Sequence, residues 1–263
     1  MTDKLSIGIV GGGAVGRAIA AFYPEAKIYD KYRPVDGIVE VAAADIVFIA
    51  VPTPFEQGPD LREMDDAVAQ VVGHLRNPKG QLVVIKSTVV PGTTETYQKR
   101  YPEVNFLFNP EFLTEKTAVI DFAKPDKQVV GYTSKTREFA PKLLSTLPPA
   151  ENEVSVTAIE AELGKYAINS YYAFKVIFAN MLYDFTEALS VDYDEVRRAF
   201  TCDQRIVDSH FDVMHAGYRG YAGKCLPKDI KTLSWFSERA GSKLDFINEI
   251  IRRNEILTEK KII

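Results

Sequence analysis

The sequence predicts an α/β protein in which a doubly wound, mainly parallel sheet is followed by an all-helical region with one long helix. Two observations lead to this prediction. The first half of the chain alternates short, nearly continuous apolar runs with amphipathic stretches, as parallel strands covered on both faces do. In the second half, proline is absent between Ala150 and Leu226, and a long apolar stretch replaces the alternation.

Each predicted element follows from these patterns. The expected strands are residues 5–10, 26–30, 45–51, 81–87, 105–110 and 127–132. Residues 14–23 and 64–75 have helical spacing between strands, which favours a parallel sheet. Residues 157–190 are apolar around most of a helix, so we expect one long helix buried on nearly every side. Two further helices are expected near residues 192–200 and 229–257.

The domain boundary and the cellular setting follow from composition. Two prolines within residues 145–154 separate the halves, which predicts a sheet domain over residues 1–150 and a helical domain over residues 151–263. A net charge of −4 gives no electrostatic reason to bind nucleic acid or an anionic membrane. The N-terminus lacks a leader pattern, and polar residues interrupt the most apolar segment, residues 166–182. We therefore expect a cytoplasmic protein.

Neither a disulfide framework nor a metal site is expected. Cys202 and Cys225 are too few for a disulfide scaffold in a chain of 263 residues. The histidines, His74, His210 and His215, combine with the cysteines in no ligand spacing, so we expect surface or packing roles for them and no metal.

A glycine motif follows the first predicted strand and opens the first helix. Gly11-x-Gly13-x-x-Gly16 permits a tight turn and close approach of a pyrophosphate to a helix N-terminus, as in a Rossmann-type sheet. Asp30 ends the second strand, 19 residues after Gly11, where a carboxylate accepts ribose hydroxyls and repels a 2′-phosphate. NAD is therefore expected rather than NADP; the alternative is a glycine turn without ligand. The expected contacts are Gly11, Gly13, Ala14, Val15, Gly16, Asp30 and Arg33.

Polar residues also gather at later strand ends. Thr53 and Thr88 follow two strands and are candidates for lining the cofactor cleft, although a strand-end threonine is often a local cap. Glu111 and Glu115, in "NPEFLTE", place carboxylates at the same sheet edge.

The long helix carries polar residues that its apolar surface does not explain. Lys165 and Asn169 are four residues apart and share a helical face, which favours a functional pair over a snorkelling lysine beside a packing amide. For Lys175 and Asn180 we expect mainly the packing role.

The stretch "GYAGKCLPKD" (residues 220–229) holds the remaining candidate. Lys224 and Lys228 flank Cys225 in a glycine-containing loop, where a thiol could have a lowered pKa and be accessible.

In order, "GGGAVG", "FIAVPTP", "KSTVVPGTT", "NPEFLTE", "AELGKYAINSYYAFK", "CDQRI" and "YAGKCLPKD" resemble motifs of the UDP-glucose/GDP-mannose dehydrogenases. The resemblance runs from Ile7 to about Ile263. It implies oxidation of a nucleotide-sugar C6 alcohol, such as that of UDP-glucose, to the acid with two NAD.

The resemblance also implies roles for the candidate residues. Cys225 is the nucleophile, which traps an aldehyde as a thiohemiacetal and then carries a thioester. Lys165 and Asn169 stabilise negative charge on the reacting oxygen, and Asp229 handles protons with the lysine and ordered water.

Further positions match the surroundings of that chemistry. Glu111, Glu115 and Thr88 match positions around the water and the nicotinamide, and Asp30 and Thr53 match cofactor contacts. The substrate contacts implied are Phe112, Leu113, Lys165, Asn169, Arg205, Tyr221 and Gly223. The implied role of Arg205 is to reach across a homodimer to the neighbouring active site, so the other subunit would cover the long helix.

The sequence departs from the family at several places. Only residues 31–44 separate the second and third strands, where a longer insertion is usual. Ala222 and Gly223 replace a tandem glycine, and Lys224 stands where a small or aromatic residue is common. The family's third, C-terminal domain is expected to be absent. Two alternatives therefore stay open: a non-catalytic NAD-binding or assembly protein, and the same chemistry on a different or smaller sugar.

Overall fold

The computed structural model describes residues 5–33, 35–215 and 217–259 of the chain. It divides into two compact units, one extending to Lys165 and the other starting at Tyr166, called unit 1 and unit 2 below. The division falls inside one helix, α7 (Ala158–Leu189), which confirms the long helix predicted over residues 157–190.

Unit 1 contains a mainly parallel sheet whose strands run in the order β2-β1-β3-β4-β5-β6-β7. The strands are β1 (Ile7–Val10), β2 (Lys27–Tyr29), β3 (Ile46–Ile49), β4 (Leu82–Ile85), β5 (Asn105–Phe108), β6 (Lys127–Tyr132) and β7 (Asn152–Thr157). Neighbouring strands pair in parallel, except that β5 and β6 are antiparallel. This is the doubly wound, Rossmann-like sheet that the sequence predicts. Its last strand, β7, lies beyond residue 150.

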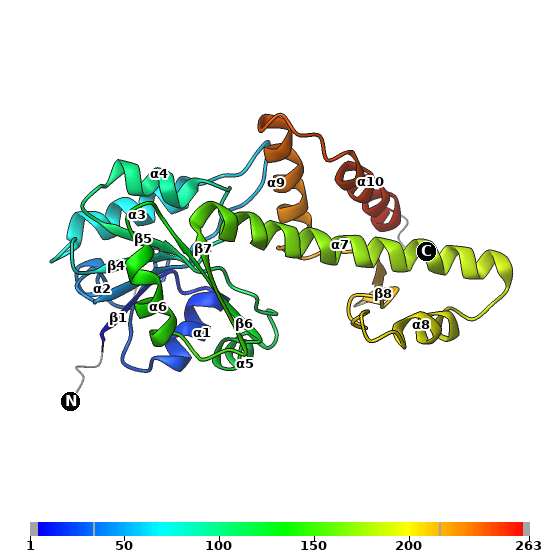
Figure 1. The fold of residues 1–263 in the computed structure, drawn as a ribbon, viewed down its shortest axis with the longest axis horizontal. Helices are drawn as coiled ribbons and strands as arrows, with labels where there is room; N and C mark the ends of the chain where they lie inside the picture. Colours follow the sequence, from blue (N-terminus) through cyan, green and yellow to red (C-terminus); the bar gives the residue numbers. More distant parts are fainter. Residues whose placement is uncertain (1–4, 34, 216, 260–263) are drawn as a thin grey trace. The chain divides into compact units, whose positions relative to one another are not determined.

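Helices cover both faces of this sheet. They are α1 (Ala14–Phe22), α2 (Ile38–Ala42), α3 (Arg62–His74), α4 (Thr93–Arg100), α5 (Ala118–Ala123) and α6 (Ala140–Thr146), with a short 3₁₀ turn at Arg137–Phe139. Side chains alternate along each strand, so Val47 and Ile49 enter the core beneath α2, α3 and α4, whereas Ile46 and Phe48 enter the core beneath α1, α5 and α6. Figure 1 shows α3 and α4 on one side of the sheet and α1 and α5 on the other. Burial on both faces explains the continuous apolar runs.

Unit 2 is mainly helical. After α7 it contains α8 (Tyr193–Thr201), α9 (Leu226–Arg239) and α10 (Asp245–Glu259), with a hairpin formed by β8 (Met214–His215) and β9 (Tyr218–Arg219). The prediction of one continuous helix over residues 229–257 is therefore wrong. Helix α9 ends at Arg239, and Gly241 with φ of +77° lets the chain turn before α10.

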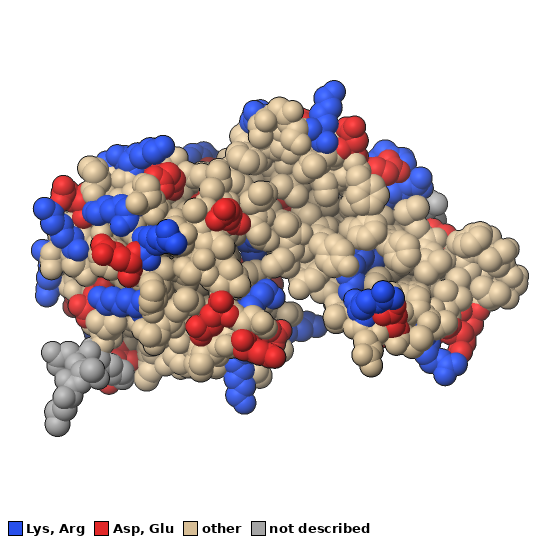
Figure 2. All heavy atoms as spheres, viewed as in Figure 1, with Lys and Arg blue, Asp and Glu red and all other residues tan. Residues whose placement is uncertain are grey.

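The part of α7 in unit 2 is not buried on every side within this chain. Ala173 and Ile177 pack in a core with residues of α9 and α10, but a series of large apolar side chains is exposed. These are Tyr171, Phe178, Met181, Phe185 and Leu189. The surface over α7 in Figure 2 is correspondingly almost uncharged, while elsewhere on the drawn face acidic and basic groups are interspersed. The expectation of near-complete burial is thus wrong for the single chain.

Candidate active site

The glycine motif forms the turn between β1 and α1. Gly11 has φ of +105°, a conformation that favours glycine. A Cβ on Gly16 would lie 1.8 Å from the carbonyl oxygen of Gly11, so this position has no room for a side chain. A Cβ on Gly13, by contrast, would meet no atom within 4 Å, so the backbone is open to approach there. The motif therefore combines a closed turn with one open backbone position.

The N-terminus of α1 fits a phosphate group. Gly13 is its N-cap and no side chain caps the helix, while Ala14 and Val15 start a first turn without an acidic residue. The first amide N–H groups of a helix attract an anion when no side chain competes for them.

Asp30 lies against the glycine turn. One carboxylate oxygen accepts the Gly12 N–H at 2.7 Å, and the other accepts the N–H groups of Tyr32 and Arg33, each at 2.9 Å. The Gly12 N–H is the main reason that the pKa of Asp30 is lowered. A carboxylate that stays ionised beside an open glycine turn fits the adenosine ribose of NAD. The Arg33 side chain is exposed, and its charge also contributes to lowering the pKa of Asp30.

The ends of β3 and β4 are joined by polar contacts. The Thr53 hydroxyl donates to the carbonyl oxygen of Thr88 at 2.7 Å, and the Ser87 hydroxyl donates to the carbonyl oxygen of Val51 at 2.7 Å. Both predicted threonines therefore lie at the carboxyl edge of the parallel strands, where ligands bind in such sheets. This bond of Thr53 joins residues 35 apart in the sequence, so it is not the local cap that was the alternative for it.

A buried lysine links the ends of β4 and β5. Lys86 is 2% exposed, and its Nζ donates to Asn109 Oδ1 at 2.7 Å. The Asn109 amide is itself fixed, because its Nδ2 donates to the carbonyl oxygen of Val129 at 2.8 Å. Burial lowers the pKa of Lys86 from 10.5 to about 7, with Glu111 acting in the opposite direction.

Glu111 and Lys165 form a buried ion pair beside this lysine in unit 1. Lys165 Nζ lies 3.3 Å from Glu111 Oε1, with the side chains 4% and 13% exposed. The other oxygen of Glu111 accepts the Leu113 N–H at 2.7 Å, and the ring of Phe112 lies 5.1 Å from Lys165 Nζ. The structure thus brings together Lys165, Glu111, Phe112 and Leu113, all of which the sequence predicts for the site. Glu115 follows this segment and is exposed.

The first turns of α7 are held on unit 1 by Glu162. This buried carboxylate accepts the N–H groups of Gly92 and Thr94 at 2.5 and 2.9 Å and the Thr94 hydroxyl at 2.6 Å. Gly92 is the N-cap of α4 and has no side chain of its own to cap that helix, so Glu162 does it from another element. Lys165 lies one turn further along α7 and is positioned by this contact.

In unit 2, Cys225 is exposed at the N-cap of α9. Asp229, one turn into α9, is 1% exposed and accepts the Asn169 amide at 2.5 Å. Lys228 Nζ also contacts the Asp229 carboxylate. A hydrogen bond therefore joins two motifs that are 60 residues apart in the sequence. As the N-cap, Cys225 lies at the end of α9 where the helix dipole favours an anion.

The other residues predicted for the substrate lie in the loops of unit 2. Arg205 is exposed and pairs with Asp203 at 2.5 Å. Tyr221 is buried among residues of α7, α9 and α10, and Gly223 has φ of +82°.

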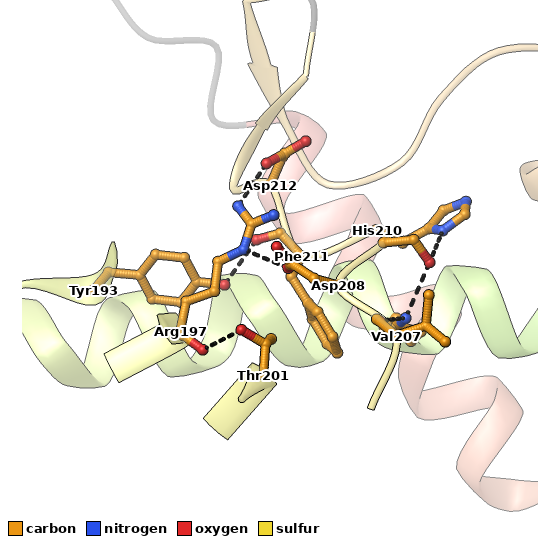
Figure 3. Close-up of polar contacts among 10 residues, drawn as sticks. Tyr193, Arg197, Thr201, Val207, Asp208, His210, Phe211 and Asp212 are labelled. Atoms are coloured by element: carbon orange, nitrogen blue, oxygen red, sulfur yellow. Dashed lines mark hydrogen bonds and ion pairs between the residues drawn. The ribbon is translucent and has the colours of Figure 1, made fainter. Parts of the chain in front are cut away.

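Lys175 has the packing role expected for it. Its Nζ donates to the carbonyl oxygen of Val207 at 2.7 Å and lies 4.3 Å from the ring of Phe211. Arg197 of α8 binds Asp208 and Asp212 of the same loop at 2.8 and 2.6 Å (Figure 3). These contacts hold the loop that carries Arg205.

Asn180 also has a packing role. Its Oδ1 accepts Arg219 Nε of β9 at 2.9 Å, and its Nδ2 donates to the carbonyl oxygen of Val176 at 2.9 Å. Its partners therefore lie in the hairpin and in α7 itself.

Four further residues of interest escaped sequence reasoning: Lys86, Asn109, Glu162 and Asn254. Lys86 lies in a strand-like apolar run, where a lysine is rare and could therefore have indicated a special role. The next two belong to quoted motifs, but their partners depend on contacts between distant segments. Asn254 had no signal in the sequence.

Two negative findings concern the described residues. They contain no group of three or more histidine, cysteine or acidic side chains that could hold a metal ion. Among these same residues, every helix is too short or too polar to span a bilayer.

Known proteins match both units. The NAD-binding domain of the UDP-glucose/GDP-mannose dehydrogenase family matches residues 33–147, and the central domain of this family matches residues 159–256. The glycine turn precedes the first match, so its assignment rests on its own geometry.

Individual relatives agree. The UDP-glucose 6-dehydrogenase of Rickettsia conorii is 33% identical over 82% of this chain and 50% of that protein. The protein of the same name from Pseudomonas aeruginosa is 35% identical over 81% of this chain and 49% of that protein. A solved UDP-glucose dehydrogenase from Pyrobaculum islandicum is 29% identical with a TM-score of 0.83, covering 97% of this chain and 69% of that one.

The chain thus spans about half the length of the curated relatives it matches. Its two units correspond in order to two successive domains of one family, and the described fold matches a solved member of that family. The chain therefore belongs to the UDP-glucose/GDP-mannose dehydrogenase family, of which it contains the NAD-binding and central domains.

Proposed function

We propose that the chain carries out the chemistry of an NAD-dependent nucleotide-sugar 6-dehydrogenase and oxidises UDP-glucose to UDP-glucuronate through Cys225. The observation that carries the proposal is the hydrogen bond between Asn169 and Asp229, which links the amide motif of α7 to the thiol motif of α9. The names of the relatives support UDP-glucose as the substrate.

NAD would be held by the glycine turn and by Asp30. When bound, NAD accepts a hydride from the substrate carbon at each of the two oxidations. The open backbone at Gly13 and the uncapped start of α1 would receive the pyrophosphate, and the Asp30 carboxylate would receive the ribose hydroxyls. Thr53 and Thr88 would line the cleft at the strand ends.

The thiol separates the two oxidations. In the first, the C6 carbon gives up a hydride and its hydroxyl gives up a proton, which leaves an aldehyde. The Cys225 thiolate then forms a C–S bond to that carbon and the oxygen takes up a proton, giving a thiohemiacetal. In the second oxidation this carbon loses a hydride and the hydroxyl loses a proton, giving a thioester. Water then breaks the C–S bond, which releases the carboxylate and a proton and restores the thiol.

The charged and amide groups would act on the oxygen of the same carbon. Lys165 supplies a cation and Asn169 an N–H donor for the oxyanion that forms when the thiolate adds. Glu111 holds Lys165 in place, and we assign proton transfer to Asp229 together with Lys165 and water. Asp229 is buried and bonded to Asn169, which fixes its orientation.

The test uses the two cysteines of the chain. Purified protein with NAD and UDP-glucose should form about two NADH per sugar, because two oxidations share one thiol. Cys225→Ser should abolish acid formation, whereas Cys202→Ser, which removes the other exposed thiol, should leave it unchanged. Normal acid formation by the Cys225→Ser variant would contradict the mechanism.

The same assay separates the alternatives. A panel of UDP-glucose, GDP-mannose, UDP-N-acetylmannosamine and sugar phosphates should show turnover with UDP-glucose. Turnover of another compound of the panel instead would mean that the proposed substrate is wrong while the proposed chemistry still holds. Binding of NAD without turnover of any member would favour a non-catalytic role.

We also propose that the chain forms a homodimer through α7. The exposed apolar side chains of α7 in unit 2 form a stripe that is in contact with water in a single chain. This contact is unfavourable, and a partner surface would remove it. Arg205 is exposed on a loop that Lys175 and Arg197 anchor, so it is available to a second copy.

A further inference from the structure

Asn254 in α10 is buried, and both ends of its amide bind one residue of the thiol loop. Its Oδ1 accepts the Tyr221 N–H at 2.7 Å, and its Nδ2 donates to the Tyr221 carbonyl oxygen at 2.9 Å. The residue is 8% exposed, although its neighbours Arg252 and Arg253 lie on the exposed side of the helix. An amide in this position satisfies both backbone groups of Tyr221 at once.

The loop from Gly220 to Cys225 depends on such external contacts. It has no regular secondary structure, and both Gly220 and Gly223 have positive φ angles, of +80° and +82°. A Cβ on Gly220 would lie 2.5 Å from Asn254 Oδ1, so the chain passes directly against the amide. The conformation of this loop is therefore set partly by α10.

Tyr221 is held by its side chain as well as by its backbone. The ring packs in the core that contains Ala173 and Ile177 of α7, Ile230 of α9 and Ile250 of α10. Four residues later, Cys225 begins α9 as its N-cap. A loop this short that is fixed at Tyr221 constrains the place where the thiol stands relative to the first amides of α9.

We propose that Asn254 is a positioning residue for the Cys225 thiol. By clamping the Tyr221 backbone, it keeps the Gly220–Cys225 loop in the conformation that places the thiol at the N-terminus of α9. This inference rests on the proposed function, in which Cys225 is the nucleophile. It adds a helix outside the quoted motifs to the control of that thiol's reactivity.

The test measures alkylation of the thiol directly. Cys225 and Cys202 are both exposed, so the ratio of their alkylation rates with iodoacetamide, read by peptide mass spectrometry, has an internal reference. Asn254→Leu should lower the Cys225 rate at pH 7 by about fivefold, the loss expected when a thiolate leaves a helix N-terminus. The Cys202 rate should not change, and the midpoint of the Cys225 pH–rate profile should move to higher pH.

Two further variants make the result specific. Asn248→Leu removes an amide of the same helix that bonds Ser234 of α9 instead of the loop, and it should leave the Cys225 rate unchanged. Asn254→Asp keeps the acceptor for the Tyr221 N–H but places its second oxygen against the Tyr221 carbonyl oxygen, so it should also lower the Cys225 rate. Should Asn254→Leu fail to fold, Asn254→Asp provides the comparison.

A merely structural role predicts a different outcome. In that case the Asn254 variants would lower the melting temperature while the Cys225 to Cys202 ratio and the pH–rate profile stayed as in the wild type, and the proposal would be overturned. Because alkylation requires neither NAD nor sugar, this outcome is distinct from failure of the dehydrogenase assay. If turnover is present, Asn254→Leu should lower kcat and leave the KM for NAD unchanged.

Discussion

Replacing Lys86 with methionine should stabilise the protein at neutral pH and destabilise it at high pH. Lys86 Nζ is buried, donates to Asn109 Oδ1 at 2.7 Å and lies 5.6 Å from the ring of Phe122. Its pKa is lowered from 10.5 to about 7 because burial penalises the ammonium. Methionine has a similar length and carries no charge, so it removes this penalty together with one hydrogen bond.

The magnitude follows from the difference between the folded and unfolded pKa values. Between about pH 7 and pH 10.5 the unfolded chain binds a proton that folded Lys86 does not, so wild-type stability rises with pH across this window. The difference between 10.5 and about 7 corresponds to about 5 kcal/mol, all of it unfavourable to the fold below pH 7. Leaving the Asn109 oxygen without a donor costs about 1–3 kcal/mol.

The two effects predict a crossover. Lys86→Met should be more stable than the wild type by about 2–4 kcal/mol at pH 6 and less stable by about 1–3 kcal/mol above pH 10.5. Urea unfolding at a series of pH values measures the difference. Lys99→Met, the same substitution at an exposed site of α4, should show no such dependence. Parallel pH profiles for Lys86→Met and the wild type would refute the reasoning.

Three other predictions concern the cofactor turn, the cap of α4 and the α7 stripe. Gly16→Ala should cost at least about 2 kcal/mol, because its Cβ would lie 1.8 Å from a backbone oxygen, whereas Gly13→Ala should keep the melting temperature and weaken NAD binding in calorimetry. A Gly13→Ala variant with wild-type NAD affinity would contradict the assignment of this turn to NAD binding. Glu162→Ala leaves three donors without an acceptor, two of them buried, and should lower the unfolding free energy by about 3 kcal/mol or more, while Glu187→Ala, exposed on the same helix, should have little effect. Equal effects of the two variants would contradict the capping role. Phe185→Asp places a charge on a side chain that is 58% exposed in the single chain and should yield a monomer in light scattering; an unchanged dimer would place the interface elsewhere.

Much of the fold was predictable because local patterns determine it. Continuous apolar runs such as residues 45–51 predict strands buried on two faces, and Val47 and Phe48 do enter opposite cores. The break between α9 and α10 was missed because Gly241 was not recognised as a helix end. Strand β7 was missed because its first four residues are exposed and carry no continuous apolar run.

The candidate site divides in a similar way. Residues in short motifs, such as Gly11, Asp30 and Cys225, could be chosen from the sequence because their chemistry depends on spacing along the chain. The partners of Lys86 and Glu162 could not, because they depend on which strand ends and helix termini meet after folding.

The sequence by itself determined the doubly wound sheet, the long helix and the candidate residues proposed for NAD and thiol chemistry, because hydrophobic periodicity and motif spacing are local properties. Only the tertiary structure decided that a lysine is buried at the end of β4, that Glu162 caps α4 and that Asn254 clamps the thiol loop. Each of these depends on burial and on hydrogen bonds between segments far apart in the chain. Such contacts form only when the packed core removes water from groups that would otherwise bind it.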